Sequence, residues 1–100
     1  MALRLKQGVR INGITPEMVI GVIIIMDAIE KYGNLTITAC TDGKHMRGSK
    51  HYTGNAVDIR TWTIPKEKER EFAGELKGAL GTNFDVVLHT THIHVEYHPK

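Results

Sequence analysis

The segment from Thr15 to Gly33 places the tightest constraint on the fold of this chain. It contains the run MVIGVIIIM at residues 18–26, which carries no polar side chain. Spanning a bilayer takes ~20 such residues, so the run predicts a buried helix and no membrane partner. Thr15 is a suitable N-cap, Pro16 suits the first helical position, and Gly33 can follow the last turn. The helix predicted over about 16–32 is apolar on nearly all sides in its first half, so other elements must cover it.

Alternating, β-branched segments predict strands at residues 35–40 and 56–62. In the second strand, Asp58 and Arg60 alternate with apolar residues and therefore share the opposite face. Residues 41–54 contain three glycines and no apolar periodicity, which predicts a long loop. Loops of this length inside a compact domain are often functional.

The second half of the chain predicts one more helix and a hairpin. The helix covers about 65–80, and its buried stripe is expected to consist of Phe72, Ala73, Leu76, Ala79 and Leu80. The hairpin occupies the last twenty residues, with Thr90-Thr91 as a two-residue turn. That register pairs His89 with His92 on the face that also carries His94 and Glu96. These elements predict an α+β fold, in which a small antiparallel sheet packs against helices and leaves an open face for a metal site.

Length and composition limit the classes of protein to which this chain can belong. A chain of 100 residues with 24% charged residues is typical of a globular domain, and we expect residues 1–100 to form one domain and a monomer. The net charge of +2 is too small to favour a nucleic-acid partner. A lone cysteine, Cys40, excludes an internal disulfide and favours a reducing compartment. The stretch MALRLKQGVR has no apolar secretory segment, so we expect synthesis in the cytoplasm without a signal peptide.

Several histidines and one aspartate suggest a metal site. Asp58, His92 and His94 project from strands whose other faces are apolar. Two histidines and a carboxylate, with one position left open to water, form the ligand set of a catalytic zinc site. His51 lies seven residues before Asp58, an odd spacing that would put the two on opposite faces of an unbroken strand. They can meet at one metal only if the chain turns between them, and Thr-Gly-Asn at 53–55 is suited to that turn.

Two motifs resemble those of a known enzyme family. Residues 49–58, SKHYTGNAVD, match S-x-H-x-x-G-x-A-x-D, and residues 89–94, HTTHIH, match H-x-x-H-x-H. In this order the motifs resemble those of the D-Ala-D-Ala carboxypeptidase family of zinc metallopeptidases, which is grouped with the lysostaphin-type peptidases and the hedgehog signalling domain. The similarity covers the chain from about Thr36 to Tyr97. It implies a zinc-dependent carboxypeptidase or endopeptidase that cuts peptidoglycan stem peptides next to a D-amino acid.

The resemblance also implies a role for each residue of the motifs. The ligands of a single Zn²⁺ would be His51, Asp58 and His94, with water in the fourth position. The metal would lower the pKa of that water towards ~7 and polarise the scissile carbonyl. Relatives often carry a Glu base three residues before the last ligand, but Thr91 stands there in this chain. The catalytic proton transfer would then fall to His92, with His89 assisting it or stabilising the oxyanion. Glu96 fits a residue that orients a histidine and an ordinary solvated strand residue equally well.

The chain departs from the family in its substrate-binding turn. Relatives usually carry an Arg in a T-S-G-x-R-like turn upstream of the first ligand, but TDGKH at residues 41–45 contains none. We expect substrate contacts from Lys44, Arg47 and Ser49, with Arg60 as a further cation that could take the role of the missing Arg. His45 fits an ordinary loop residue and a substrate contact equally well.

Other functions compete with an enzyme of this family. A non-catalytic, zinc-containing binding module is the stronger rival, because the hedgehog domain uses the fold in that way. His89 and His92 favour an enzyme, because holding the metal requires neither of them. A Cys-His hydrolase would need Cys40 as nucleophile, but a cysteine at the end of a β-branched strand is more typical of a core. Each histidine taken alone is also typical of a solvated strand face.

A minimal catalytic domain of this kind resembles phage lysis enzymes. These are made in the cytoplasm and released to the bacterial cell wall by another protein. The resemblance therefore implies action at the cell wall, with a peptidoglycan peptide as the partner.

Overall fold

A computed structural model of the chain describes residues 2–43, 45 and 47–100. The strands in this part of the chain are β1 (Leu3–Leu5), β2 (Leu35–Ala39), β3 (Ala56–Arg60), β4 (Phe84–Leu88) and β5 (His92–Tyr97). They form one sheet in the order β1-β2-β3-β5-β4. The pairings between β2, β3, β5 and β4 are antiparallel, whereas β1 pairs with β2 in parallel. The α+β prediction is confirmed, with the correction that one edge strand of the sheet is parallel.

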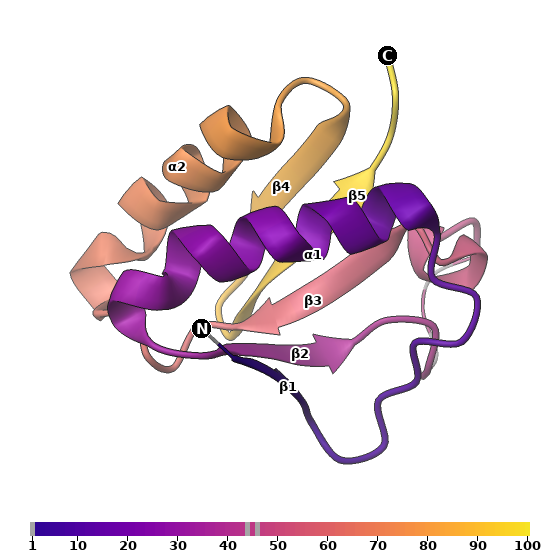
Figure 1. Ribbon diagram of the computed structural model, residues 1–100, viewed down its shortest axis with the longest axis horizontal. Coiled ribbons are helices and arrows are strands. Elements are labelled where there is room, and N and C mark those ends of the chain that lie inside the picture. The colour runs from indigo at the N-terminus through magenta and orange to yellow at the C-terminus, as the bar shows by residue number, and fades with distance from the viewer. Residues whose placement is uncertain (1, 44, 46) are drawn as a thin grey trace.

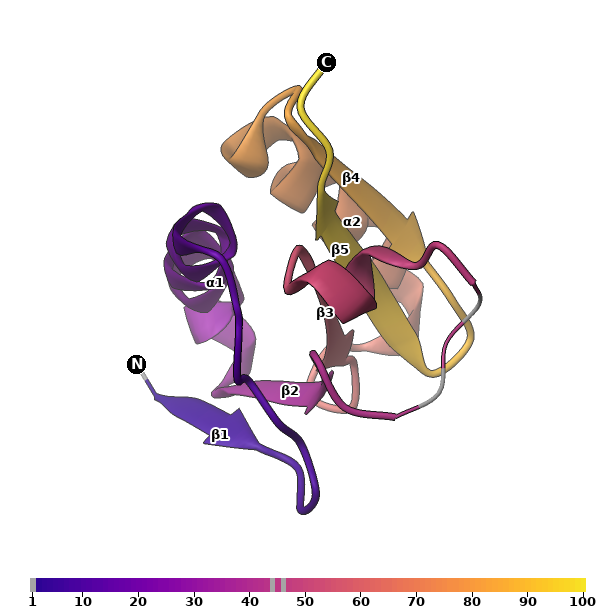
Figure 2. The same ribbon diagram turned by 90° about the vertical axis from the view of Figure 1, so that its right-hand side faces the viewer.

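Two α-helices accompany the sheet, α1 (Pro16–Ile29) and α2 (Glu69–Leu80). Short 3₁₀ helices are η1 (Glu30–Tyr32), η2 (Lys50–Thr53) and η3 (Lys66–Lys68). Figure 1 shows α1 lying across the sheet with α2 beside it, and Figure 2 shows η2 next to the strands β3 and β5. Residues from both helices and from β2, β3, β4 and β5 form one apolar core. None of the helices in the described part of the chain has the length and apolar character needed to cross a membrane.

Helix α1 begins as predicted but is covered only on one side. The Oγ1 of Thr15 accepts a hydrogen bond from the backbone N–H of Met18 at 3.2 Å, which satisfies one free donor of the first turn. The opposite side exposes Val19, Ile20 and Ile23 by 42%, 56% and 57%. The prediction that other elements cover this helix all round is therefore wrong for its first half.

The second predicted helix divides into η3 and α2, and its apolar stripe packs into the core. Phe72, Ala73, Leu76 and Leu80 are buried, as the periodicity predicts. Ala79 is exposed, which contradicts its expected place on the stripe. The stripe is narrower than predicted because the sequence pattern alone does not fix how the helix is rotated against its neighbours.

The strand register places the polar residues of β3 and β5 opposite one another. Asp58 pairs with His94, and Arg60 pairs with His92. The predicted hairpin is confirmed, because the backbone N–H of His89 donates to the carbonyl of His92 at 2.8 Å across the Thr90-Thr91 turn. The strand β3 ends at Arg60, two residues earlier than expected, and the predicted loop at 41–54 contains the 3₁₀ helix η2.

Gly54 ends η2 in a conformation that another residue would adopt only with strain. Its φ is +75°, and a Cβ at this position would lie 2.0 Å from the carbonyl oxygen of Gly13. The carbonyl of Gly54 accepts a hydrogen bond from the backbone N–H of Thr15 at 3.1 Å, and Thr15 Oγ1 lies 2.9 Å from the side-chain oxygen of Asn55. The turn after His51 is therefore packed against the start of α1.

We expect Gly54→Ala to destabilise the protein by ~3 kcal/mol, because it adds backbone strain to a clash with a fixed carbonyl. The matched control is Gly74→Ala in α2, where a Cβ meets no atom within 4 Å and alanine favours the helix. The midpoints of urea unfolding measure both effects. Equal midpoints for the two variants would contradict this account of the turn.

Candidate metal centre

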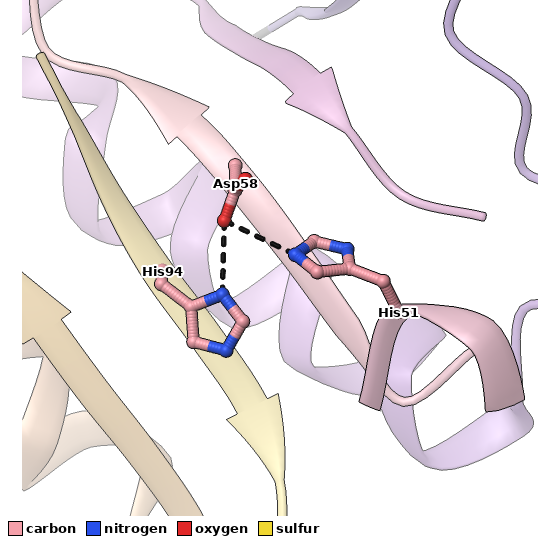
Figure 3. Close-up of side chains that lie close together, drawn as sticks. All are labelled: His51, Asp58 and His94. Carbon is pink, nitrogen blue, oxygen red and sulfur yellow. Dashed lines mark hydrogen bonds and ion pairs between the residues drawn. The ribbon is translucent and has the colours of Figure 1, made fainter. Parts of the chain in front are cut away.

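Three elements direct one side chain each to a common point: η2 supplies His51, β3 supplies Asp58 and β5 supplies His94 (Figure 3). The Nε2 of His51 lies 3.3 Å from Oδ1 of Asp58, and the Nδ1 of His94 lies 2.9 Å from the same oxygen. One ligand atom from each residue lies within 4.8 Å of the other two. These residues could therefore hold a metal ion.

The ring of His51 is held in one orientation. Its Nδ1 lies 2.7 Å from the carbonyl oxygen of Cys40, and because a carbonyl only accepts, Nδ1 carries a proton and donates it. This leaves Nε2 to face Asp58. The backbone N–H of His51 donates to Oγ of Ser49 at 3.2 Å, and the side chain is almost fully buried. The turn predicted at Gly54 is confirmed, and it brings His51 to the face of the sheet that carries Asp58.

His94 lies between two carboxylates. Its Nδ1 faces Asp58, and its Nε2 lies 2.9 Å from Oε1 of Glu96. Carboxylates only accept, so in this arrangement the ring carries a proton on both nitrogens. The hydrogen bond with Asp58 raises the pKa of His94 above its usual value, against the opposing effect of burial, and Glu96 contributes to the rise.

Asp58 remains ionised although it is partly buried. Burial alone would raise its pKa, but hydrogen bonds from His51 and His94 outweigh that effect and hold the pKa of this carboxyl well below its usual range. The carboxylate therefore attracts positive charge into a small space. The ring N–H of His94 meets that demand here, and a cation that takes the place of this proton would release it.

The donor set fits a divalent metal that accepts nitrogen and oxygen ligands. His51 offers Nε2 while its Nδ1 stays bound to a backbone carbonyl, and His94 offers Nδ1 while its Nε2 stays bound to Glu96. Orientation of ligating histidines through their second nitrogen is a general feature of metal sites. Glu96 thus occupies the orienting position that the sequence suggested for it.

The two remaining histidines of the terminal motif lie beside these three residues. The Nε2 of His92 lies 3.9 Å from Oδ2 of Asp58, and its Nδ1 lies 3.2 Å from Oγ1 of Thr91. The ring of His89 stacks on that of His92 with centroids 4.6 Å apart. Partial burial lowers the pKa of His92 below its usual value, with Asp58 opposing the effect. A ring that is neutral near pH 7 can accept a proton.

These histidines line an open pocket of about 460 Å³. Its lining consists of His45, Arg47, Gly48, Ser49, Lys50, His51, Asp58, His89, His92, His94 and Glu96. The candidate metal ligands lie in the pocket with basic side chains around them. The pocket can therefore bring a solvent-accessible ligand next to the metal-binding group.

The residues expected to bind substrate differ in where the structure places them. Arg47 lines the pocket. Ser49 also lines it, but its Oγ accepts the hydrogen bond that begins η2, which gives it a structural role. Lys44 lies outside the described residues. Arg60 does not line this pocket; its guanidinium lies over the ring of Trp62 at 3.8 Å.

His45 supports His51, a contact that sequence reasoning did not predict. The two rings are stacked with centroids 3.9 Å apart and planes at 12°. Tyr52 holds His45 in place, because its hydroxyl accepts from the backbone N–H of His45 and donates to its carbonyl. His45 lies in a loop and His51 lies in η2, so no common strand or helix period relates the two residues, and the sequence contained no signal for this contact.

Cys40 has the environment of a core residue. It is fully buried, and burial raises the pKa of its thiol to about 11. Its backbone carbonyl contacts Nδ1 of His51. A buried thiol that stays protonated near pH 7 is unsuited to nucleophilic attack, so the geometry disfavours the Cys-His hydrolase.

A second group that could hold a metal consists of Asp85, Glu96 and His98. It is more exposed, and Nζ of Lys100 lies 2.9 Å from Oδ1 of Asp85. The lysine already neutralises this carboxylate, which makes the group a weaker cation site than the one around Asp58.

A scan of the chain against protein-family models and a search of curated proteins gave no match. The family resemblance therefore rests on the two motifs, and the geometry supports a metal-binding group without identifying the metal.

Proposed function

We propose that this protein is a zinc-dependent peptidase that hydrolyses peptidoglycan stem peptides next to a D-amino acid. One observation carries the proposal. His51, Asp58 and His94 offer three converging ligand atoms in an open pocket, while His89 and His92 lie alongside without being needed to hold a metal. The choice of zinc and of the substrate class rests on the resemblance of the two motifs to the family.

In this proposal each residue of the pocket has its own role. His51, Asp58 and His94 would hold the zinc, which when bound polarises the scissile carbonyl and lowers the pKa of water. His92, 3.9 Å from Asp58, would take up and return the proton, and the stacked ring of His89 would hold His92 in position. Arg47 lines the same pocket and would contact an oxygen of the substrate. We further propose that the protein acts at the bacterial cell wall as a phage lysis enzyme.

Mass spectrometry of purified peptidoglycan digested with the zinc-loaded protein tests the function. We expect new fragments with a terminus at a D-amino acid, and the masses of these fragments identify the bond that is cut. The same protein treated with a chelator is the control and should release none. Zinc binding without cleavage of any wall peptide would refute the peptidase and favour the rival, a zinc-containing binding module.

A further inference from the structure

A second, smaller hollow lies on the same face of the sheet and shares a wall with the metal pocket. Its volume is about 190 Å³, and it is lined by Lys6, Thr38, Arg60, Trp62, Thr91 and His92. The side chain of His92 lines both hollows. Arg60 follows Asp58 by two residues along β3, which places it ~7 Å further along the sheet. The two hollows are therefore neighbouring positions for one extended ligand.

The charges of the smaller hollow favour an anion. In the part of the chain that the structure describes, Lys6 and Arg60 line it and no carboxylate does. Among the described residues neither of these cations makes an ion pair. Two cations that line one hollow without a compensating charge form a local positive field.

The guanidinium of Arg60 lies over the ring of Trp62. The ring lies 3.8 Å from the guanidinium carbon, although 76% of the tryptophan is exposed to solvent. A guanidinium stacked on an aromatic ring keeps its N–H groups at its edge, where they can bind the two oxygens of a carboxylate. The stacking thus restricts the arginine before a ligand arrives and lowers the entropy that binding would cost.

We propose that Arg60, held by Trp62, and Lys6 form a subsite for a carboxylate of the peptide substrate. This inference rests on the proposed peptidase function and deepens it. A peptide chain advances by ~3.3 Å per residue, so the bound carboxylate belongs to a residue about two positions from the bond at the metal pocket. The subsite would make the protein prefer a peptide with a free carboxylate at that position over the same peptide amidated there, and the α-carboxyl of D-glutamate in a stem peptide serves as the probe.

The test uses the fact that Trp62 is the only tryptophan of the chain. Two synthetic stem pentapeptides, identical except for a free or an amidated α-carboxyl on D-glutamate, are titrated into the zinc-loaded protein. Stopped-flow fluorescence records binding before turnover. We expect the free acid to bind about tenfold more tightly than the amide, because only the acid forms charge-assisted hydrogen bonds with Arg60.

Three variants assign the preference to the hollow. Arg60→Gln should reduce the ratio of the two affinities to near one, and Lys6→Gln, at an exposed position, should reduce it in part. The matched control is Arg70→Gln, which removes an exposed arginine on α2 and should leave the ratio unchanged. Both affinities in the ratio are measured on the same variant, so a change in the resting fluorescence of Trp62 does not affect the ratio.

The titration separates this subsite from the peptidase activity because it requires no cleavage. Equal affinity for the acid and the amide in the unmodified protein, or a preference that persists in Arg60→Gln, overturns the subsite whether or not peptides are cut. A preference that depends on Arg60 in a protein that cuts no peptide supports the subsite and refutes the peptidase.

Discussion

Replacing Asp58 by alanine is expected to remove the metal from the protein. Asp58 contributes the one carboxylate of the group, and both His51 and His94 direct a ring nitrogen to it. Without it, two histidines would remain, and a histidine that binds a metal is a neutral ligand that cannot balance the charge of a dication. Loss of a residue that only orients a ligand already costs 10- to 100-fold in metal affinity, so we expect a loss of roughly a hundredfold or more. Zinc per chain after dialysis, measured by atomic absorption, should fall from one ion to nearly none.

His51→Ala should have the same effect, and His98→Ala provides the matched control. His98 is an exposed histidine in the second group, with Asp85 and Glu96. If the metal binds at Asp58, the His98 variant keeps its zinc; if it binds in the second group, the pattern reverses. Circular dichroism establishes that each variant is folded. Full retention of zinc by both Asp58→Ala and His51→Ala would refute the ligand assignment.

The sequence predicted those parts of the fold that depend on local chemistry. Thr15 and Pro16 mark the start of α1 because capping is decided within one turn. The hairpin at Thr90-Thr91 followed from alternation on both sides of a two-residue connection. The spacing of His51 and Asp58 predicted the turn at Gly54, since no unbroken strand could bring the two side chains to one point.

Features that depend on neighbours distant in sequence were missed. The strand β1 has only three residues, all exposed, and forms because β2 offers it a free edge. Ile20 and Ile23 are exposed because they lie on the side of α1 that faces away from the core, and the apolar run does not encode which side that is. The stacking of His45 on His51 and of Arg60 on Trp62 arises from the placement of loops and strand ends. Tertiary packing, and not propensity, decides each of these contacts.

We expect His92→Ala to keep its zinc and to lose most of its turnover. His92 is not one of the three converging ligands, yet its Nε2 lies only 3.9 Å from Oδ2 of Asp58 and its ring lines the pocket. A side chain that transfers a proton in the transition state contributes 10²- to 10⁴-fold, so kcat should fall by about that factor while zinc per chain stays at one. Cleavage of stem peptides, followed by chromatography alongside the metal measurement, checks both quantities in the same sample.

The matched variant for this prediction is His89→Ala. The ring of His89 stacks on that of His92 but makes no contact with Asp58 among those described. If His89 only positions its neighbour, its loss should reduce kcat by less than loss of His92 and should leave the metal in place. Unchanged activity in His92→Ala, with a large loss in His89→Ala, would assign the proton transfer to His89. Loss of zinc in His92→Ala would instead make His92 a ligand, which the convergence of His51, Asp58 and His94 argues against.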